Sequence, residues 1–493
     1  MAGAHSGVGM VAVPQSARLA AVTVILTMAG CADSTSPSTP THLTFVVQPS
    51  AVGVATTVTP AIVVAAQDDA ERTVSSWTDT VRLALESDDG SEALLGTTNV
   101  AAVSGTAVFE DLHIDGSGAG YRLAATSADL VPAVSRPFTV HDVFVASAVA
   151  AGDEHTCALL ADGSAYCWGR NAGGRLGDGT VEDRSMPTSV STTLRFTAIA
   201  VGQGHSCGLT SGGVAHCWGR NGYGQLGNGT SDSALTPNEV VFGSPFVALD
   251  AGYYHTCGLT ADGGAQCWGD NSYGQLGDGT DSTRTTPTAV AGGLVFVSIS
   301  AGYLHTCGLT TDRVAYCWGG NVYAELGDGT YERRLVPTAV FGDHRFALLN
   351  AGGGPCHGKT CGITPNGVTL CWGHNYQDGP RRRTTPTALD GDPSFASVVT
   401  GPLAVCGITA EGALYCWGQG LYGQVGNGTA GDVTIPTPIQ PDRGFASVSL
   451  GGAHTCGLTT EGIAYCWGSN GSGQLGSGSN PAGWAIPVRV WKP

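Results

Sequence analysis

From residue 143 almost to the end of the chain, short apolar runs alternate with glycine-rich polar segments. The clearest copy of this pattern covers residues 251–269, and each copy contains a Cys-Trp-Gly triplet. In this copy the alternation predicts strands over residues 246–250, 255–260, 264–268 and 286–290. The tryptophans of successive copies lie 50, 50, 50, 54, 45 and 50 residues apart, at Trp168, Trp218, Trp268, Trp318, Trp372, Trp417 and Trp467. Seven copies of a four-stranded unit with this period predict a seven-bladed β-propeller over residues 142–493.

The pattern differs between residues 41 and 141. Polar turns such as residues 88–90 and 115–118 separate short alternating runs here, which predicts an antiparallel β-sandwich. Residues 64–70 and 120–126 resemble bacterial immunoglobulin-like domains of surface proteins, and this resemblance implies a spacer. The predicted strands cover residues 43–47, 61–66, 81–85, 106–109, 121–125 and 137–140.

The first forty residues are typical of an export signal followed by a tether. Arg18 precedes an apolar run over residues 19–29, which is too short to span a bilayer and fits a signal-peptide core. Residues 28–31, Met-Ala-Gly-Cys, resemble a bacterial lipobox, which implies cleavage after residue 30 and lipidation of Cys31. An ordinary signal peptide with an incidental cysteine is the alternative. Residues 31–40 are rich in Ser, Thr and Pro, as a flexible tether is.

Composition supports an all-β chain and limits the classes of partner that the chain is expected to bind. The 493 residues include 75 glycines and only 12% charged residues, which favours strands and tight turns. The net charge is −17 and the only lysines are Lys359 and Lys492, so no basic face for nucleic acid is expected. The acidity identifies no partner by itself. We expect a monomer that binds an unknown protein and touches a membrane only through its lipid.

Three motifs of the repeat identify a family. They are Gly-x-x-His-Thr-Cys-x-Leu at residues 252–259, Trp-Gly-x-Asn at 268–271 and Gly-Gln-Leu-Gly-x-Gly at 274–279. They resemble the repeats of the regulator-of-chromosome-condensation family over residues 143–490. The resemblance implies a seven-bladed propeller, and guanine-nucleotide exchange is the activity that the family name suggests.

The cysteines predict one disulfide per repeat. Between Cys157 and Cys167, residues 161–163 fit a three-residue hairpin loop, which places the two cysteines directly opposite each other. That geometry, with export, favours disulfides over zinc, which needs four converging ligands. Cys356 is left over, with Cys361 as an alternative partner. The predicted pairs are Cys157 with Cys167, Cys207 with Cys217, Cys257 with Cys267, Cys307 with Cys317, Cys361 with Cys371, Cys406 with Cys416, and Cys456 with Cys466.

No catalytic, cofactor-binding or metal-binding site is expected. Residues 204–208 match the nucleophile elbow of hydrolases, but a strand follows instead of a helix. The Asp-Gly pairs at Asp178, Asp278 and Asp328 lack the spacing of a calcium loop and fit turns. The histidine before each cysteine, as in His255, is interpreted as turn-stabilising.

The fifth repeat breaks the symmetry. It carries an insertion over residues 353–360 and then Arg381, Arg382 and Arg383 in an otherwise acidic chain. These arginines are the candidate interaction site for an anionic surface or ligand, and a solvated loop is the alternative.

The sequence as a whole favours an exported, membrane-anchored or extracellular, non-enzymatic scaffold that binds proteins. Guanine-nucleotide exchange is one alternative, although an exported protein would not meet a cytosolic GTPase. Inhibition of a secreted enzyme is another, since secreted β-lactamase-inhibiting propellers resemble this fold. It predicts aromatic side chains crowded on one face, with the candidates Tyr253, Tyr254, Tyr303 and Tyr323.

Overall fold

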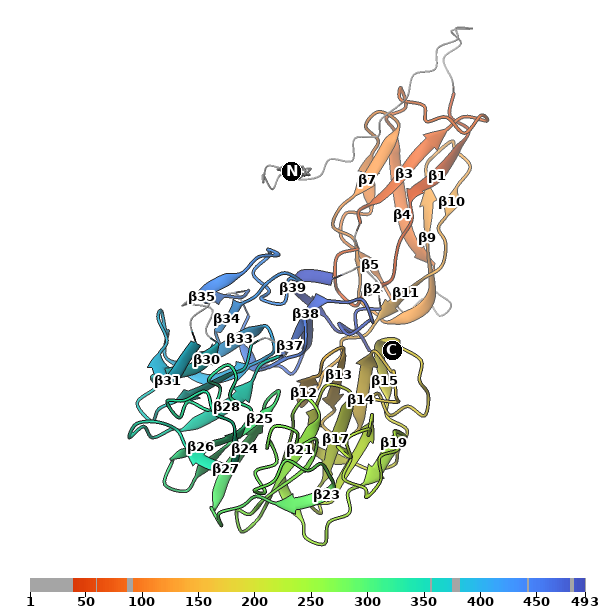
Figure 1. Ribbon diagram of the computed structural model, residues 1–493. Helices are drawn as coiled ribbons and strands as arrows, with labels where there is room; N and C mark the ends of the chain where they lie inside the picture. Colours follow the sequence, from red (N-terminus) through yellow and green to blue (C-terminus); the bar gives the residue numbers. More distant parts are fainter. Residues whose placement is uncertain are drawn as a thin grey trace, which may run out of the picture.

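The computed structural model describes residues 39–58, 60–86, 92–354, 357–374, 382–440, 443–478 and 483–492. Every regular element in these residues is a β-strand (Figure 1). None of the described residues forms a helix long and apolar enough to cross a membrane. The predicted signal, the anchor Cys31, Cys356 and Arg381 all lie outside the described residues.

The N-terminal part consists of two main sheets packed on one core. One has the strand order β1-β3-β7, and the other has the order β2-β11-β9-β4-β6, with β10 paired to β9 and a separate β5-β8 pair. Val64, Leu83 and Leu123 are fully or almost fully buried between them. The strands are β1 (His42–Val47), β2 (Val52–Gly53), β3 (Ile62–Gln67), β4 (Thr80–Glu86), β5 (Leu94–Leu95), β6 (Asn99–Ala101), β7 (Thr106–Phe109), β8 (His113–Ile114), β9 (Gly118–Thr126), β10 (Ala133–Val134) and β11 (Phe138–His141).

The described residues of the repeat region form seven sheets, each of four consecutive antiparallel strands. The first three are β12 (Ala148–Ala151), β13 (His155–Leu159), β14 (Ala165–Gly169), β15 (Arg184–Ser189); β16 (Phe196–Val201), β17 (His205–Thr210), β18 (Ala215–Gly219), β19 (Ala234–Glu239); and β20 (Phe246–Ala251), β21 (His255–Thr260), β22 (Ala265–Gly269), β23 (Arg284–Ala289). The next two are β24 (Phe296–Ala301), β25 (His305–Thr310), β26 (Ala315–Gly319), β27 (Arg334–Ala339); and β28 (Leu348–Gly352), β29 (Lys359–Ile363), β30 (Thr369–His374), β31 (Arg382–Ala388). The last two are β32 (Phe395–Thr400), β33 (Ala404–Thr409), β34 (Leu414–Gly418), β35 (Val433–Pro438); and β36 (Phe445–Leu450), β37 (His454–Thr459), β38 (Ala464–Ser469), β39 (Gly483–Arg489).

Each sheet packs against the next through its tryptophan. Trp268 of the third sheet is fully buried in a cluster with Leu209, Leu226 and Phe246. Gly227, in the Gly-Gln-Leu-Gly segment of the second sheet, has φ +68°, and a Cβ there would lie 2.6 Å from the indole nitrogen of Trp268. A glycine is therefore required at this turn both by its backbone angle and by the close approach of the ring.

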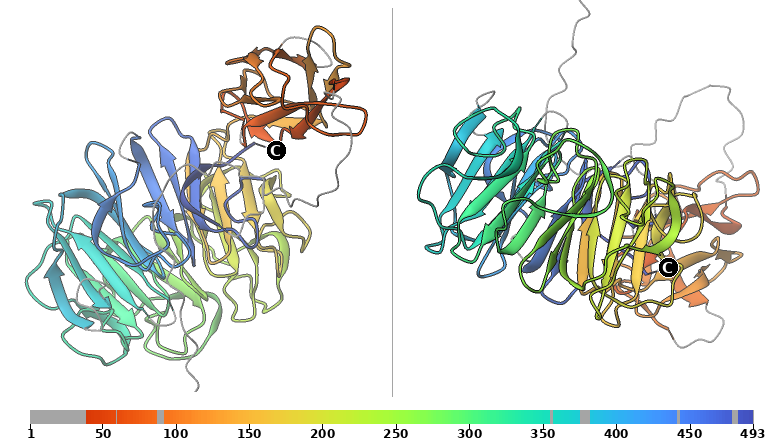
Figure 2. Two further views of the ribbon diagram at one scale, coloured as in Figure 1. Left: turned by 90° about the horizontal axis from the view of Figure 1, so that it is seen from above. Right: turned by 60° about the horizontal axis from the view of Figure 1, so that its bottom comes forward.

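The sheets surround a central axis because each first strand contacts the first strands of its two neighbours. This holds for the first and last sheets too, where β12 contacts β36 (Figure 2). The segment before β12 completes the last sheet: Val143 pairs with Trp491 and Val145 pairs with Ile463. The repeat region is thus a closed β-propeller in which the first and last residues of the repeat region share one sheet.

The sandwich lies beside the first and last sheets (Figure 1). The ring of Trp491, which follows β39, occupies the place that a side chain at Gly53 of β2 would need. In addition, the amide of Lys492 donates to the carbonyl of Asp142 at 2.9 Å. The point where the ring closes is therefore also the point where the two parts of the molecule meet.

Candidate functional site

One end of the propeller gathers the residues in which the repeats differ. In the third sheet, residues 252–254 connect the first two strands, and residues 270–283 connect the last two. Because successive strands are antiparallel, these two loops lie at the same end of the sheet. We call this end, with the equivalent loops of every sheet, the loop face.

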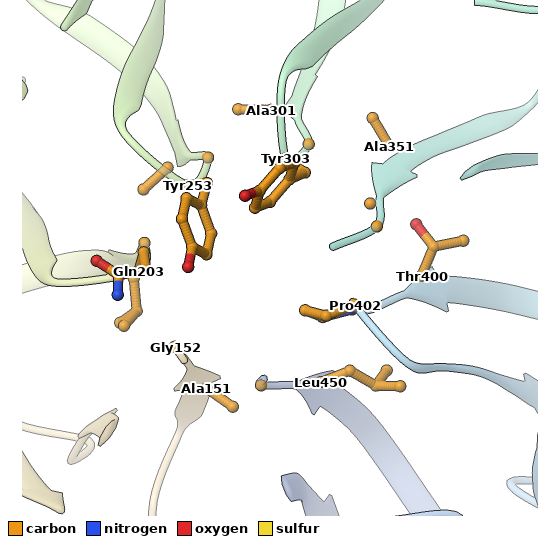
Figure 3. A pocket seen from close by; sticks show the side chains of 18 of the residues that line it. Ala151, Gly152, Gln203, Tyr253, Ala301, Tyr303, Ala351, Thr400, Pro402 and Leu450 are labelled. Atoms are coloured by element: carbon orange, nitrogen blue, oxygen red, sulfur yellow. The ribbon is translucent and has the colours of Figure 1, made fainter. Parts of the chain in front are cut away.

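A cavity of about 210 Å³ opens at the centre of the loop face, between the ends of the first strands (Figure 3). Each first strand ends near a glycine, and the residue after that glycine decides the chemistry of the rim. On one arc of the rim these residues are Asp153, Gln203, Tyr253 and Tyr303, and on the other they are Gly353, Pro402 and Gly452. The cavity is therefore polar and aromatic on one side and almost bare on the other.

Four tyrosines form a continuous cluster beside the cavity. Ring centroids are 4.8 Å apart for Tyr223 and Tyr254, 4.5 Å for Tyr254 and Tyr253, and 4.3 Å for Tyr253 and Tyr303. Three of the four tyrosines proposed from the sequence thus meet in what we call the tyrosine cluster. Tyr323 lies outside this cluster, where its ring contacts the guanidinium of Arg382. Sequence reasoning missed Tyr223, because only the fold brings the loop of Tyr223 against the next sheet.

The charge at the rim is concentrated at Asp153. The side chain of Gln203 donates Nε2–H to Asp153 Oδ2 at 3.2 Å. Burial, mainly, raises the pKa of Asp153 above its usual value. The pKa of the Tyr253 phenol is also raised, first by burial and then by the negative charge of Asp153. The rim therefore carries one carboxyl group on the same arc as the phenols of Tyr253 and Tyr303.

Deeper in the cavity, polar side chains tie the first strands together. Asp250 accepts the amides of Ala251 and Ala301, both at 2.9 Å. Ser300 accepts the amide of Ala351 at 3.0 Å in the equivalent arrangement one sheet further on. Removal from solvent raises the pKa of Asp250 to about 6.

The buried histidines connect neighbouring sheets, a contact that the sequence did not predict, and their carbonyls also accept the amides of the turn glycines, as His255 does from Gly252. His255 Nε2 lies 2.9 Å from the hydroxyl of Thr306, which itself donates to the carbonyl of Gln275 at 2.8 Å. Since the hydroxyl proton is used on that carbonyl, the imidazole donates from Nε2. Burial lowers the pKa of His255 to about 4. Equivalent contacts join His155 to Ser206, His205 to Thr256, His305 to Thr360 and His454 to Thr156.

Lys359 occupies the histidine position of the fifth sheet. It is buried, and its Nζ donates to the carbonyl of Pro402 at 3.4 Å. Burial lowers the pKa of this amine to about 7. The sequence contains the signal for this substitution, since Lys359-Thr-Cys aligns with His-Thr-Cys, but only the fold shows that the amine is buried.

The structure joins the fourteen paired cysteines in the predicted combinations. In the first sheet Cys157 lies directly opposite Cys167, and the sulfur–sulfur distance is 2.12 Å. Within the described residues, no group of three or more His, Cys, Asp or Glu side chains could hold a metal ion. The other six disulfides, each with the same ten-residue separation, join Cys207 to Cys217, Cys257 to Cys267, Cys307 to Cys317, Cys361 to Cys371, Cys406 to Cys416, and Cys456 to Cys466.

The repeated aspartates hold loops in place. Asp278 Oδ1 accepts the amide and hydroxyl of Thr280 at 2.9 and 2.7 Å, and its Oδ2 pairs with Arg284 at 2.7 Å. The side chain of Asn271 donates to the same carboxylate at 3.1 Å. Every oxygen is thus bonded within the protein, as a structural turn requires.

Two of the candidate arginines, Arg382 and Arg383, are described, and both belong to β31. The guanidinium of Arg382 lies 4.6 Å above the ring of Tyr323 and donates to the carbonyl of Val322 at 2.5 Å. Arg383 donates to the carbonyl of Ala388 at 3.2 Å. Arg382 thus contacts the loop between β26 and β27, which carries Tyr323.

Comparisons with protein families find matches in the repeat region of this chain. The RCC1-like domain matches residues 115–379, and the Regulator of chromosome condensation (RCC1) repeat matches residues 411–458 and 445–474. No curated protein sequence matches the chain.

Among solved structures, human WBSCR16 is 20% identical with a TM-score of 0.59, covering 67% of this chain and 94% of that one. Yeast RCC1 (Prp20) bound to Kap60 is 20% identical with a TM-score of 0.60, covering 71% and 85%. Prp20p from Saccharomyces cerevisiae, reported with its binding properties to Gsp1p and histones, is 21% identical with a TM-score of 0.59, covering 71% and 88%. At such identities the shared property is the fold.

Proposed function

Because the chain belongs to the RCC1-like domain family, whose match covers more than half of its residues, we propose that it is a non-enzymatic propeller that binds a protein partner through the loop face. The observation that supports this proposal is the tyrosine cluster beside the central cavity. Tyrosines supply large, rigid contact areas, and protein interfaces are enriched in them. In the solved complex of yeast RCC1 with Kap60, a member of this fold also has a protein partner.

Substitutions on the two ends of the propeller test the proposed face. The variant Tyr223→Ser with Tyr254→Ser removes two rings of the tyrosine cluster. The control Val214→Ser removes an apolar side chain that is 39% exposed in the hairpin between β17 and β18, at the opposite end of the propeller. Affinity capture from envelope extracts should lose a specific partner with the first variant and keep it with the control. Equal loss or equal retention would contradict the proposal.

The same proposal includes the location and organisation of the chain. Residues 1–30 are a signal peptide, Cys31 carries a lipid, residues 31–40 form a tether, and the sandwich is an immunoglobulin-like spacer below a seven-bladed propeller. The protein is a monomer in the cell envelope. Labelling with radioactive palmitate should depend on Cys31, and a Cys31→Ser variant that is labelled equally would contradict the lipid anchor.

Inhibition of a secreted enzyme is the second candidate function. It is favoured by the tyrosine cluster, because an inhibitor needs aromatic anchors crowded on one face. Inhibition of secreted β-lactamases by the purified protein, abolished in the double tyrosine variant, would support it. Guanine-nucleotide exchange has no comparable support, since seven disulfides fit poorly with the reducing cytosol.

A further inference from the structure

We propose that the central cavity of the loop face binds the cationic side chain of a lysine or arginine from the protein partner. This inference rests on the proposed function and adds the chemistry of the contact. It is carried by the distribution of charge, hydrogen-bond acceptors and apolar surface over the wall of one cavity.

The charge of the wall is negative. The described residues that line the cavity include two carboxylates, Asp153 and Asp250, and no lysine, arginine or histidine. Two basic side chains outside the lining donate to backbone carbonyls of lining residues: Arg175 donates to the carbonyl of Gln203 at 3.2 Å, and Lys359 donates to that of Pro402. A cation that enters the cavity therefore meets acidic groups first, in a chain whose net charge is −17.

The polar arc is rich in acceptors. Gln203 Oε1 is buried and has no hydrogen-bond partner, while Nε2 of the same side chain holds Asp153. The rings of Tyr253 and Tyr303 stand next to each other on the same arc as Gln203 (Figure 3). An ammonium or guanidinium placed here gains both a charge-assisted hydrogen bond and contact with aromatic rings.

The opposite arc fits the hydrocarbon stem of the same side chain. Pro402, Leu450 and Ala351 line it, and Gly353 and Gly452 place no side chain over the entrance. A volume of about 210 Å³ is below the range of small-molecule sites and suits one long side chain. Lysine and arginine bury their stems against apolar surface while their charge finds polar groups, which is the arrangement that this cavity offers.

Calorimetric titration of the full chain with blocked amino acids tests the inference. N-acetyl-lysine methylamide and N-acetyl-arginine methylamide should bind, and N-acetyl-norleucine methylamide, which has no charge, should bind about tenfold more weakly. Asp153→Asn should weaken binding of the cations by about tenfold. The control Asp343→Asn changes the net charge equally at an exposed site between the fourth and fifth sheets and should leave binding within about twofold.

Each outcome bears on the inference. Equal binding of norleucine, or unchanged affinity in Asp153→Asn, would overturn it. Tighter binding of free n-butylammonium than of blocked lysine would reassign the site to small amines and overturn the partner side chain. Partner capture with Asp153→Asn distinguishes this inference from the proposed function. Undiminished capture overturns the inference and leaves the proposed function standing. Capture lost in Asp153→Asn and kept in Asp343→Asn supports both.

Discussion

Asp278 and Arg284 show that residues at equivalent positions of the repeat vary together. Asp178 pairs with Arg184 and Asp328 with Arg334 in the same way. In the second sheet the acid is replaced by Asn228, and the arginine position is Ala234, a buried residue. The carboxylate and the guanidinium are therefore present together or absent together in these four sheets, as expected when one compensates the buried charge of the other.

The variant Arg284→Ala should lower the free energy of unfolding by about 1–2 kcal/mol, because it leaves the buried carboxylate of Asp278 without its cation. Urea denaturation measures this loss. Adding Asp278→Asn, which recreates the pair found in the second sheet, should restore most of the stability. A double variant less stable than Arg284→Ala would show that the carboxylate, and not the pair, holds the loop.

Stability should fall as the pH falls below about 6.5. His205, His305 and His454 have pKa values of about 3 in the folded protein, against 6.5 for the ordinary group, because they are buried. Between these values the unfolded chain binds more protons, so the free energy of unfolding decreases with decreasing pH. Asp250, with its pKa raised to about 6 from 3.8, has the opposite sign between those two values and offsets only one histidine.

Urea denaturation between pH 5 and pH 7 measures this dependence. The variant His255→Gln keeps a donor for Thr306 and cannot titrate, so it should reduce the slope by about 1 kcal/mol per pH unit averaged over this range. An unchanged slope would mean that the imidazole of His255 is as protonated in the folded protein as in the unfolded chain.

At the scale of single elements, the hairpin of the second and third strands is the most regular unit. In most sheets the loop of this hairpin contains a glycine with a left-handed backbone conformation. The fourth sheet lacks that glycine, and Arg313 adopts φ 62° in its place. The outer strands carry a proline, as Pro287 in β23, which has no amide to offer a further strand. Such an edge resists pairing with another chain, which suits a ring in which every sheet ends in an outer strand.

The disulfide of one hairpin should contribute measurably to stability. Replacing both Cys257 and Cys267 by serine should reduce the free energy of unfolding by about 2–3 kcal/mol, because the bridge restricts a short loop of the unfolded chain. Thermal or urea unfolding of the oxidised protein measures this effect. A titration of free thiols in denatured, unreduced protein is the control, since freely reacting cysteines would show that the bridges never formed.

Strands were predictable from the sequence because alternation and turn residues are local signals. The strands predicted over residues 246–250 and 286–290 agree with β20 and β23 to within two residues. The pairs β5-β8 and β9-β10 were not predicted, because two-residue strands such as β10 carry no periodicity of their own. Tyr223 and the cavity likewise arise from contacts between sheets, which no single repeat encodes.

At the scale of the whole molecule, ring closure depends on four residues that the sequence did not single out. Residues 143–146 add to the last sheet, and the amide of Phe144 donates to the carbonyl of Val490. The ring of Phe144 is 2% exposed and lies 5.7 Å from that of Trp168. Closure therefore uses both hydrogen bonds and burial of a large side chain.

A chain that begins at Ser147 should melt about 10 °C below one that begins at Asp142, because it loses Phe144 and the pairing with the last sheet. Differential scanning calorimetry of the two chains makes the comparison. The variant Phe144→Ala in the longer chain should show part of the loss. Equal melting temperatures would mean that the first and last sheets hold together without this segment.

Residues 143–146, which precede the first sheet, complete the last sheet. The ring therefore cannot close until β39 has left the ribosome. Six sheets are synthesised before the last sheet, and the contact between Thr156 and His454 must wait for β37 of that sheet. The ring therefore cannot reach its native form by adding one folded sheet after another during synthesis. The final step of folding joins the first and the last sheets of the ring, so a truncation within the last sheet opens the ring as surely as one within residues 143–146.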